Sequence, residues 1–267
     1  MRAAELRHVA AADDLPAYTL RLSARAKHIR LTITPRNGLV VVVPRRMSNY
    51  DPSALLRERK RWIDDATAHF ADRRAALQRD PAELLPTTIE LPATGTRWDV
   101  EYRDAAGTAA RIRSSAGRLV VTAPAGDPGV AIAALQRWLS ARARDHLLPL
   151  LAEESARTGH AYKRAEIRGQ RGRWGACSGR GTITLNRCLL FLPPELARAV
   201  VLHELAHVPQ PNHSAAYWHE LARLDPHAAQ HRAAIRHAWD VIPAWAEPDS
   251  AGAHRASPAD GRPGARG

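Results

Sequence analysis

Alternating apolar and polar positions near the start of the chain predict short β-strands. Residues 18–22 and 29–33 each place an apolar side chain at every second position, which is typical of a strand with one buried face. Asn37-Gly38 is a hairpin turn signal, and the β-branched run at 39–43 predicts the strand that follows it. Residues 52–77 then show helical spacing, so we expect a helical segment after these strands.

A similar order of elements returns later in the chain. Residues 98–102 alternate, an apolar run follows at 119–121, and helical spacing covers about 129–158, with a kink expected at Pro149. We interpret residues 17–127 as a β-rich N-terminal part that contains two β-β-α-like units.

The second half of the chain carries further strand and helix signals. Residues 165–192 predict strands around a turn at 178–181. Pro193-Pro194-Glu195 predicts the start of a helix, because proline and an acid are favoured at a helix N-terminus, and Pro209 ends it. A second helix is expected over about 214–225.

Composition sets the remaining boundaries. Residues 1–16 are rich in alanine and mixed in charge, which predicts a loose N-terminal arm. Residues 246–267 consist mainly of Pro, Gly, Ala, Ser and Arg, which predicts a disordered tail. We assign residues 128–245, between the β-rich part and this tail, to the domain that carries the chemistry.

The whole chain is globular in composition and strongly basic. Hydrophobic residues make up 45% and charged residues 25%, which excludes a wholly disordered chain. Lys and Arg number 39 against 27 Asp and Glu, a net charge of +12. This balance predicts weak, non-specific binding to nucleic acid. The alternative is that the arginines, which are scattered along the chain, reflect biased codon usage.

The cysteines and apolar runs predict a cytoplasmic protein with no membrane partner. Cys177 and Cys188 do not make a disulfide framework and fit a reducing compartment. The first twenty residues contain acids and no unbroken apolar stretch, so no signal peptide is visible. The longest apolar runs are too short to span a bilayer.

The strongest chemical signal is the segment His203-Glu204-Leu205-Ala206-His207. Positions four apart share one face of a helix, so His203 and His207 can bind the same Zn²⁺ ion. The carboxylate of Glu204 then lies where it can take a proton from metal-activated water. A chance match is the alternative in a chain with 13 histidines. The motif's apolar helical frame and the proline that ends it favour a metal site.

A catalytic zinc site requires a third protein ligand, with the fourth position open. We expect His213, because the turn that begins at Pro209 returns the chain toward the open end of the histidine pair. Its spacing from His207 equals that of metzincins. However, Gln210 replaces their glycine and no methionine follows for their Met-turn.

Glu220 is the second candidate for the third ligand, since gluzincins take a carboxylate from a later helix. His219 and His227 are expected to be surface residues.

Several segments in this region resemble the YgjP-like metallopeptidases, which are related to SprT-type and WLM-type zincin peptidases. The matching segments are Arg173–Cys177, Leu185-Asn186, His203–His207, Asn212–Ser214 and Tyr217-Trp218. Ala176 stands where members of this family usually have serine. The resemblance covers about residues 18–245 and is specific between 167 and 226.

The resemblance implies an α+β fold. Its zincin-like metallopeptidase core would have the active-site helix packed under a small sheet, beside a β-rich N-terminal part. It implies that one Zn²⁺ per chain is bound by His203, His207 and His213, with Glu204 as general base. An edge strand at 182–187 would hold an extended peptide.

The resemblance gives no role to Arg173, Trp174 or Asn186. We expect Cys177 to be a packed thiol, and Tyr217 either to lie in the core or to direct its hydroxyl at the site.

Two functions follow from these features. The first is a zinc metallopeptidase, a hydrolase that acts on a peptide or protein substrate. The second is a basic nucleic-acid-associated protein whose zinc site is structural or vestigial. Glu204 favours the enzyme because structural zinc needs no carboxylate beside it, and no motif for specific nucleic-acid readout is visible.

Overall fold

The computed structural model describes residues 5–12, 14–34, 37–71, 75, 80–170 and 172–247. The chain divides into two compact units, Met1–Arg79 and Asp80–Gly267. The expected boundary after residue 127 falls inside the second unit instead. The expected tail began two residues too early, because Ala246 is fully buried at the end of a 3₁₀ turn. From position 248 onward the tail lies outside the described residues. Helices and small mixed sheets together confirm the α+β fold class.

Among its described residues, the first unit contains a four-stranded sheet followed by the short helices α1 and α2. Its elements are β1 (Glu5–Val9), β2 (Tyr18–Ser23), β3 (Arg30–Thr34), β4 (Gly38–Pro44), the 3₁₀ turn η1 (Arg45–Met47), α1 (Ser53–Glu58) and α2 (Lys60–His69). The strand order is β1-β2-β4-β3, with β2 and β4 parallel and the other pairs antiparallel. β3 and β4 pair antiparallel as the expected hairpin, with Asn37-Gly38 at the end of the connection between them. Gly38 has φ +60°, in the left-handed region that favours glycine.

Residues 5–9 are a strand and not part of a loose arm. β1 pairs antiparallel with β2 in the register Leu6↔Arg21, although the described side chains of β1 are exposed. Main-chain hydrogen bonds with β2 therefore hold this strand, with little apolar burial. An argument from composition could not detect it.

Alternate residues of this sheet close a small core against the two helices. Leu20 and Leu22 of β2 and Val41 and Val43 of β4 pack with Leu56 of α1. This agrees with the alternation in the sequence, because side chains two positions apart share one face of a strand.

The second unit begins with another four-stranded sheet. Its strands are β5 (Thr88–Leu91), β6 (Thr96–Ala105), β7 (Arg111–Ser115) and β8 (Arg118–Pro124), with the 3₁₀ turns η2 (Pro81–Leu84) before β5 and η3 (Pro92–Thr94) after it. The order is β5-β6-β8-β7, with β6 and β8 parallel and the other pairs antiparallel. Strand order and strand directions therefore equal those of the first sheet.

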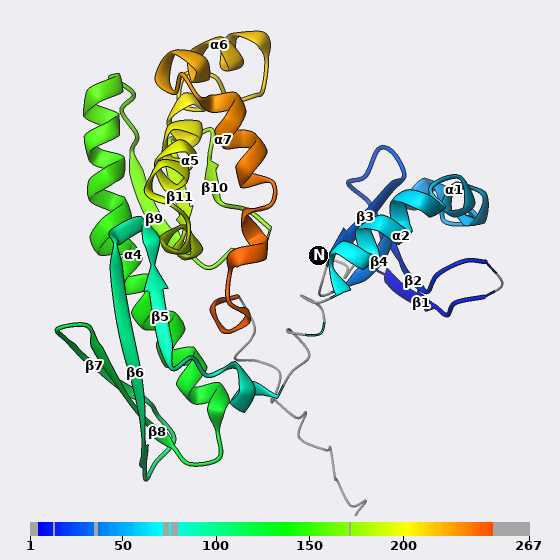
Figure 1. The fold of residues 1–267 in the computed structure, drawn as a ribbon. Helices are drawn as coiled ribbons and strands as arrows, with labels where there is room; N and C mark the ends of the chain where they lie inside the picture. Colours follow the sequence, from blue (N-terminus) through cyan, green and yellow to red (C-terminus); the bar gives the residue numbers. More distant parts are fainter. Residues whose placement is uncertain are drawn as a thin grey trace, which may run out of the picture. The chain divides into compact units, whose positions relative to one another are not determined.

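A 31-residue helix, α4 (Pro128–Thr158), follows this sheet. Asp127 caps its start by accepting a hydrogen bond from the backbone N–H of Val130, and Gly159 ends it in the left-handed conformation with φ +73°. Pro149 lies inside the helix. Figure 1 shows α4 running along the second unit, from the β6–β8 sheet toward α5.

A three-stranded sheet follows α4. It consists of β9 (Arg164–Arg168), β10 (Gly175–Cys177) and β11 (Thr182–Asn186), in the order β10-β11-β9. The expectation of an edge strand at 182–187 is wrong, because β11 pairs on one side with β10 and on the other with β9. β10 is an edge strand, and residues after 186 form the 3₁₀ turn η4 (Arg187–Phe191).

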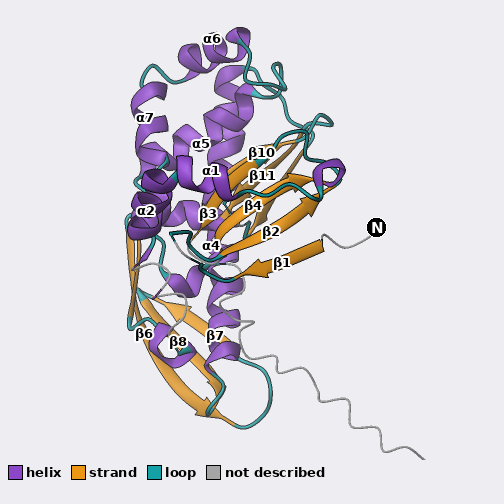
Figure 2. Cartoon of the chain, turned by 90° about the vertical axis from the view of Figure 1, so that its right-hand side faces the viewer, coloured by secondary structure: helices purple, strands orange, loops and turns teal. Residues whose placement is uncertain are grey.

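Three helices complete the second unit: α5 (Pro194–Ala206), α6 (Ala215–Leu224) and α7 (Ala228–Ile235), followed by the 3₁₀ turns η5 (Ala238–Val241) and η6 (Ala244–Ala246). α5 contacts β10, β11 and α4, and buries Val201, Leu202 and Leu205. Figure 2 shows these helices at one end of the second unit and the β6–β8–β7 sheet at the other. No helix among the described residues is long and apolar enough to cross a membrane.

Candidate active site

Three histidine side chains meet at the C-terminal end of α5. His203 and His207 come from the helix and its C-cap, and His213 comes from the loop before α6. One ligand atom from each of the three lies within 4.8 Å of the others. The Nε2 atoms of His203 and His213 are 3.4 Å apart. The structure therefore brings together the three residues that the sequence motif and the following turn predict.

Hydrogen bonds orient the two rings of the helix. His207 Nδ1 lies 3.0 Å from the carbonyl oxygen of Gln210 and can only donate to it. His203 Nδ1 lies 2.7 Å from the hydroxyl of Tyr217, which can itself donate to the His203 carbonyl at 3.4 Å. With both Nδ1 atoms carrying the proton, both Nε2 atoms keep a lone pair for a metal ion.

The third ring is held by stacking. His213 lies against the indole of Trp218, with ring centroids 5.5 Å apart and planes 25° apart. The guanidinium of Arg232 lies over the same indole at 4.5 Å. Trp218 therefore orients an otherwise exposed histidine toward its two neighbours.

The environment favours the neutral imidazoles of His203 and His213. Burial, together with the nearby His207, His213 and Arg232, lowers the pKa of His203 to about 4. Burial and then the charges of His207 and Arg232 lower the pKa of His213. Metal ligation needs the neutral imidazole, so these shifts keep the donors ready at neutral pH.

Glu204 is buried beside the histidines and packs against the edge strand. Its side chain is 5% exposed. Burial raises its pKa to about 8, although the charge of Arg173 acts in the opposite direction. A Cβ atom at Gly175 would lie 2.5 Å from Glu204 Oε1. The glycine of the 173–177 motif is therefore needed to give this carboxylate its place.

Asn186 fixes the loop that leads into β10. The side chain is fully buried, and its Nδ2 donates to the carbonyls of Gln170 at 2.8 Å and Arg173 at 2.7 Å. Its Oδ1 accepts a hydrogen bond from the Cys188 N–H at 3.0 Å. This supplies a positioning role for a residue to which the sequence gives none.

Trp174 has a packing role in the same loop. Its buried ring stacks on Trp239, with centroids 4.2 Å apart and planes 21° apart. No local pattern predicts this pair, because the two tryptophans lie far apart along the chain.

A cavity of about 220 Å³ adjoins Glu204 and His203. Its walls come from α5, α6, α7 and the loop before β10. They are formed by Arg173, Trp174, Gly175, Ala199, Val200, Leu221, Asp225, Ala228, His231, Arg232 and Ile235. The walls are mostly apolar, with exposed arginines among the lining residues. The space beside the catalytic candidate can thus receive a side chain.

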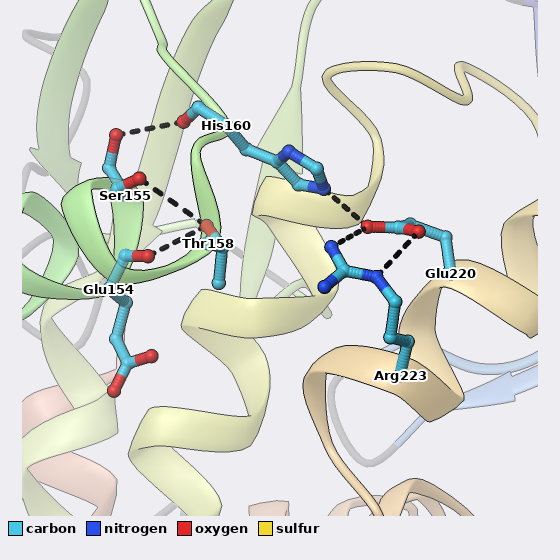
Figure 3. Close-up of polar contacts among 6 residues, drawn as sticks. All are labelled: Glu154, Ser155, Thr158, His160, Glu220 and Arg223. Atoms are coloured by element: carbon cyan, nitrogen blue, oxygen red, sulfur yellow. Dashed lines mark hydrogen bonds and ion pairs between the residues drawn. The ribbon is translucent and has the colours of Figure 1, made fainter.

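The other sequence candidates lie elsewhere. Figure 3 shows Glu220 in contact with His160 and Arg223. Its Oε1 lies 2.6 Å from His160 Nε2 and 2.7 Å from Arg223 Nη2, and Glu220 is not in the histidine cluster. The hydrogen bonds from Arg223 lower the pKa of Glu220. His219 and His227 are exposed, as expected.

Cys177 and Tyr217 also have defined places. Cys177 is a free, partly buried thiol outside the histidine cluster, and burial raises its pKa, with the charge of Glu204 acting in the same direction. Tyr217 is fully buried, and its hydroxyl contacts His203. Both alternatives considered for Tyr217 therefore hold at once.

Comparisons with known proteins identify the family of the chain. The family model of the YgjP-like metallopeptidase domain matches residues 27–238, whereas no curated protein matches the chain. The metallopeptidase zymogen of Pyrococcus abyssi abylysin is 27% identical, with a TM-score of 0.31, over 33% of this chain and 90% of that one. The metallopeptidase zymogen of Methanocaldococcus jannaschii jannalysin is 19% identical, with a TM-score of 0.31, over 34% and 94%.

Proposed function

Because the chain belongs to the YgjP-like metallopeptidase family, we propose that it is a zinc-dependent peptidase with Glu204 as its general base. The observation that carries this proposal is the meeting of three imidazoles beside a buried carboxylate. The cysteines, both free, are consistent with action in the reducing cytoplasm.

The donor set fits zinc. Three neutral imidazoles are a known ligand set of catalytic zinc and leave one position open. His203, His207 and His213 would hold one ion per chain. When bound, zinc supplies a Lewis acid that polarises a carbonyl and lowers the pKa of water.

Glu204 would move the proton. Its carboxylate accepts a proton from the attacking water and returns it to the amide nitrogen as the peptide bond breaks. Its raised pKa of about 8 belongs to the chain without a cation, and a nearby positive charge favours the ionised form that a base requires.

The edge strand and the cavity suit an extended peptide. β10 is an edge of its sheet, and its Gly175 lies against Glu204. A substrate strand can add to such an edge by main-chain hydrogen bonds. One of its side chains would enter the adjoining cavity, which would favour a residue with an apolar stem.

The deciding experiment compares Glu204→Gln with the matched control Glu220→Gln on a mixed peptide library. Glu204→Gln should keep zinc and fold but lose turnover by about a hundredfold or more, the scale of a general-base contribution. Glu220→Gln removes the same charge outside the cluster and should retain turnover. Unchanged cleavage by Glu204→Gln would refute the proposed mechanism.

Elemental analysis tests the ligand set separately. His213→Ala should lower bound zinc strongly, whereas Glu220→Ala should leave about one zinc per chain. The reverse result would identify Glu220 as the third ligand.

A further inference from the structure

The positive charge of the chain is concentrated in its first unit. Residues 1–79 contain 16 Lys and Arg against 8 Asp and Glu, a net charge of +8. Residues 80–267 contain 23 against 19, a net charge of +4 in more than twice the length. The acids are equally frequent in the two units, so the difference comes from the greater frequency of Lys and Arg in the first.

Within the first unit, cations occupy the sheet face opposite the helices. Leu20, Leu22 and Val41 point into the core, so alternation places Arg21 of β2 and Arg30 of β3 on the other face. Both stand opposite Val42 in the register of the sheet. Val42 is 1% exposed, whereas Leu6 of β1, on the same face, is 55% exposed. The face therefore presents its arginines beside one exposed apolar side chain.

More cations lie at the end of the sheet where β2 and β4 stop and β3 starts. The connection between β2 and β3 carries Arg25 and Lys27, and η1 after β4 carries Arg45 and Arg46. Arg46 Nη2 donates to the Lys27 carbonyl at 2.8 Å, which brings the two segments together.

We call these six exposed residues the cation end: Arg21, Arg25, Lys27, Arg30, Arg45 and Arg46. None of them has a carboxylate partner among the residues that the structure describes. Ion pairs among the described residues of this unit include Arg57–Asp14, Arg59–Glu58 and Lys60–Asp64, in and around α1 and α2. A hollow of about 850 Å³ lies toward the other end of this sheet, where β2 and β4 begin. Its lining includes Leu6, Val9, Tyr18 and Leu39, with Arg21 as the one member of the cation end.

The second sheet provides an internal comparison, because its topology is the same. Its corresponding face carries acids that pair with its arginines: Arg97–Glu90, Arg97–Asp99, Arg103–Glu101 and Arg118–Glu101. The first sheet has no acid at the described positions of that face. Acids that neutralise the arginines are thus present on this face of the second sheet and absent from the described positions of the first.

We propose that the cation end binds the phosphate backbone of double-stranded nucleic acid without reading its sequence. Arg21 and Arg30 are separated by β4, so their backbones are about 10 Å apart. This distributed array suits a polymer with repeated phosphates better than a single small anion. Five of the six cations are arginines, whose planar fork matches phosphate oxygens.

The same face lacks a platform for unpaired bases. Its described strand positions carry Leu6, His8, Thr19, Thr32, Val40 and Val42 beside the arginines, and no Phe, Tyr or Trp. Proteins that bind single strands stack bases on aromatic side chains. A duplex is therefore the favoured partner.

The test uses the full chain and a short blunt-ended DNA duplex at several salt concentrations. Wild type should bind, with log affinity falling linearly as log salt rises. Arg21→Gln/Arg25→Gln/Arg30→Gln should weaken binding more than tenfold near 0.1 M salt and reduce the log–log slope by about 3. The control Arg57→Gln/Arg59→Gln/Lys60→Gln removes the same charge from the helical side and should bind within about twofold of wild type.

Three results would overturn the proposal. They are equal losses in both triple variants, tighter binding to a single strand than to the duplex, and binding to anionic phospholipid vesicles without binding to the duplex. Circular dichroism of both variants establishes that each is folded. Peptide cleavage should be unaffected by either, which separates this test from that of the peptidase.

Discussion

The two four-stranded sheets have the same topology but belong to cores of different size. Each has a parallel central pair flanked by antiparallel edge strands. The first is followed by helices of 6 and 10 residues, which close a small core of their own. The second is followed by the 31-residue α4, whose buried residues belong to a much larger core.

The length of the following helix accounts for this difference. At 1.5 Å per residue, α4 is about 46 Å long, so one helix serves two partners. Leu135 and Leu139 belong to the same continuous core as Val121 of β8, and Leu147 and Leu151 to the same core as Val201 of α5. The second sheet thereby shares a core with the candidate site, whereas the first sheet closes a small core with its own helices.

The most severe test of this comparison is a cavity made in either core. Leu139→Ala should cost about 2–5 kcal/mol and lower stability, zinc retention and turnover together, because this residue is fully buried in the core that contains α5. Leu56→Ala makes a similar lesion in the first unit and should leave turnover within about twofold. Calorimetry and peptide cleavage measure both, and loss of turnover in Leu56→Ala would show that the units are coupled.

A change at Tyr217 tests whether a single hydroxyl at the histidine cluster affects zinc affinity when one in the second sheet does not. Tyr217→Phe removes the hydroxyl that faces His203 Nδ1, and we expect zinc affinity to fall about 10- to 100-fold. Tyr102→Phe is the control, since it removes a hydroxyl that donates to the Pro86 carbonyl in the second sheet. Competition with a zinc chelator measures the affinities, and equal values for the two variants would contradict the orienting role.

A methyl group at position 175 tests the contact between β10 and α5. Gly175→Ala would place Cβ 2.5 Å from Glu204 Oε1, so we expect turnover to fall about tenfold as the carboxylate shifts. Gly179→Ala lies in the turn after β10, where a Cβ meets nothing within 4 Å, and should be neutral. Steady-state kinetics measure the turnover of both variants, and their zinc content shows whether the ligand set is intact.

The smallest expected effect is a pH dependence of stability in the zinc-free protein. The pKa of Glu204 is raised from 4.5 to about 8 by burial. The native state therefore binds more protons than the unfolded state between these values, and its stability falls as pH rises through this range. Glu204→Gln removes that loss. Its Tm should equal that of wild type near pH 4 and exceed it progressively as the pH rises to 8, whereas a constant difference would refute the shift.

Local signals in the sequence predicted much of the second unit. The start of α5 follows from Pro194 and Glu195, α6 begins after the Ser214 cap, and α4 ends at Gly159. The histidine cluster was predictable for the same reason, because helix periodicity and one tight turn determine it.

Features that depend on distant partners were not predictable. β1 is held by main-chain pairing with β2, and the central place of β11 depends on its parallel contact with β9. The need for glycine at 175 comes from Glu204, which reaches it from another element. No local pattern encodes these contacts, since each is settled only when segments far apart in the chain meet.

The contacts that hold the three histidine rings have a consequence for conformational entropy. Immobilising a side chain with several rotamers on binding costs about 0.5–1.5 kcal/mol. Here the Gln210 carbonyl, Tyr217 and Trp218 have already selected the orientation of each ring. The rings therefore lose this rotational freedom when the chain folds, before an ion binds. An ion can be taken up or lost at donors that stay in place, without refolding of the chain around it.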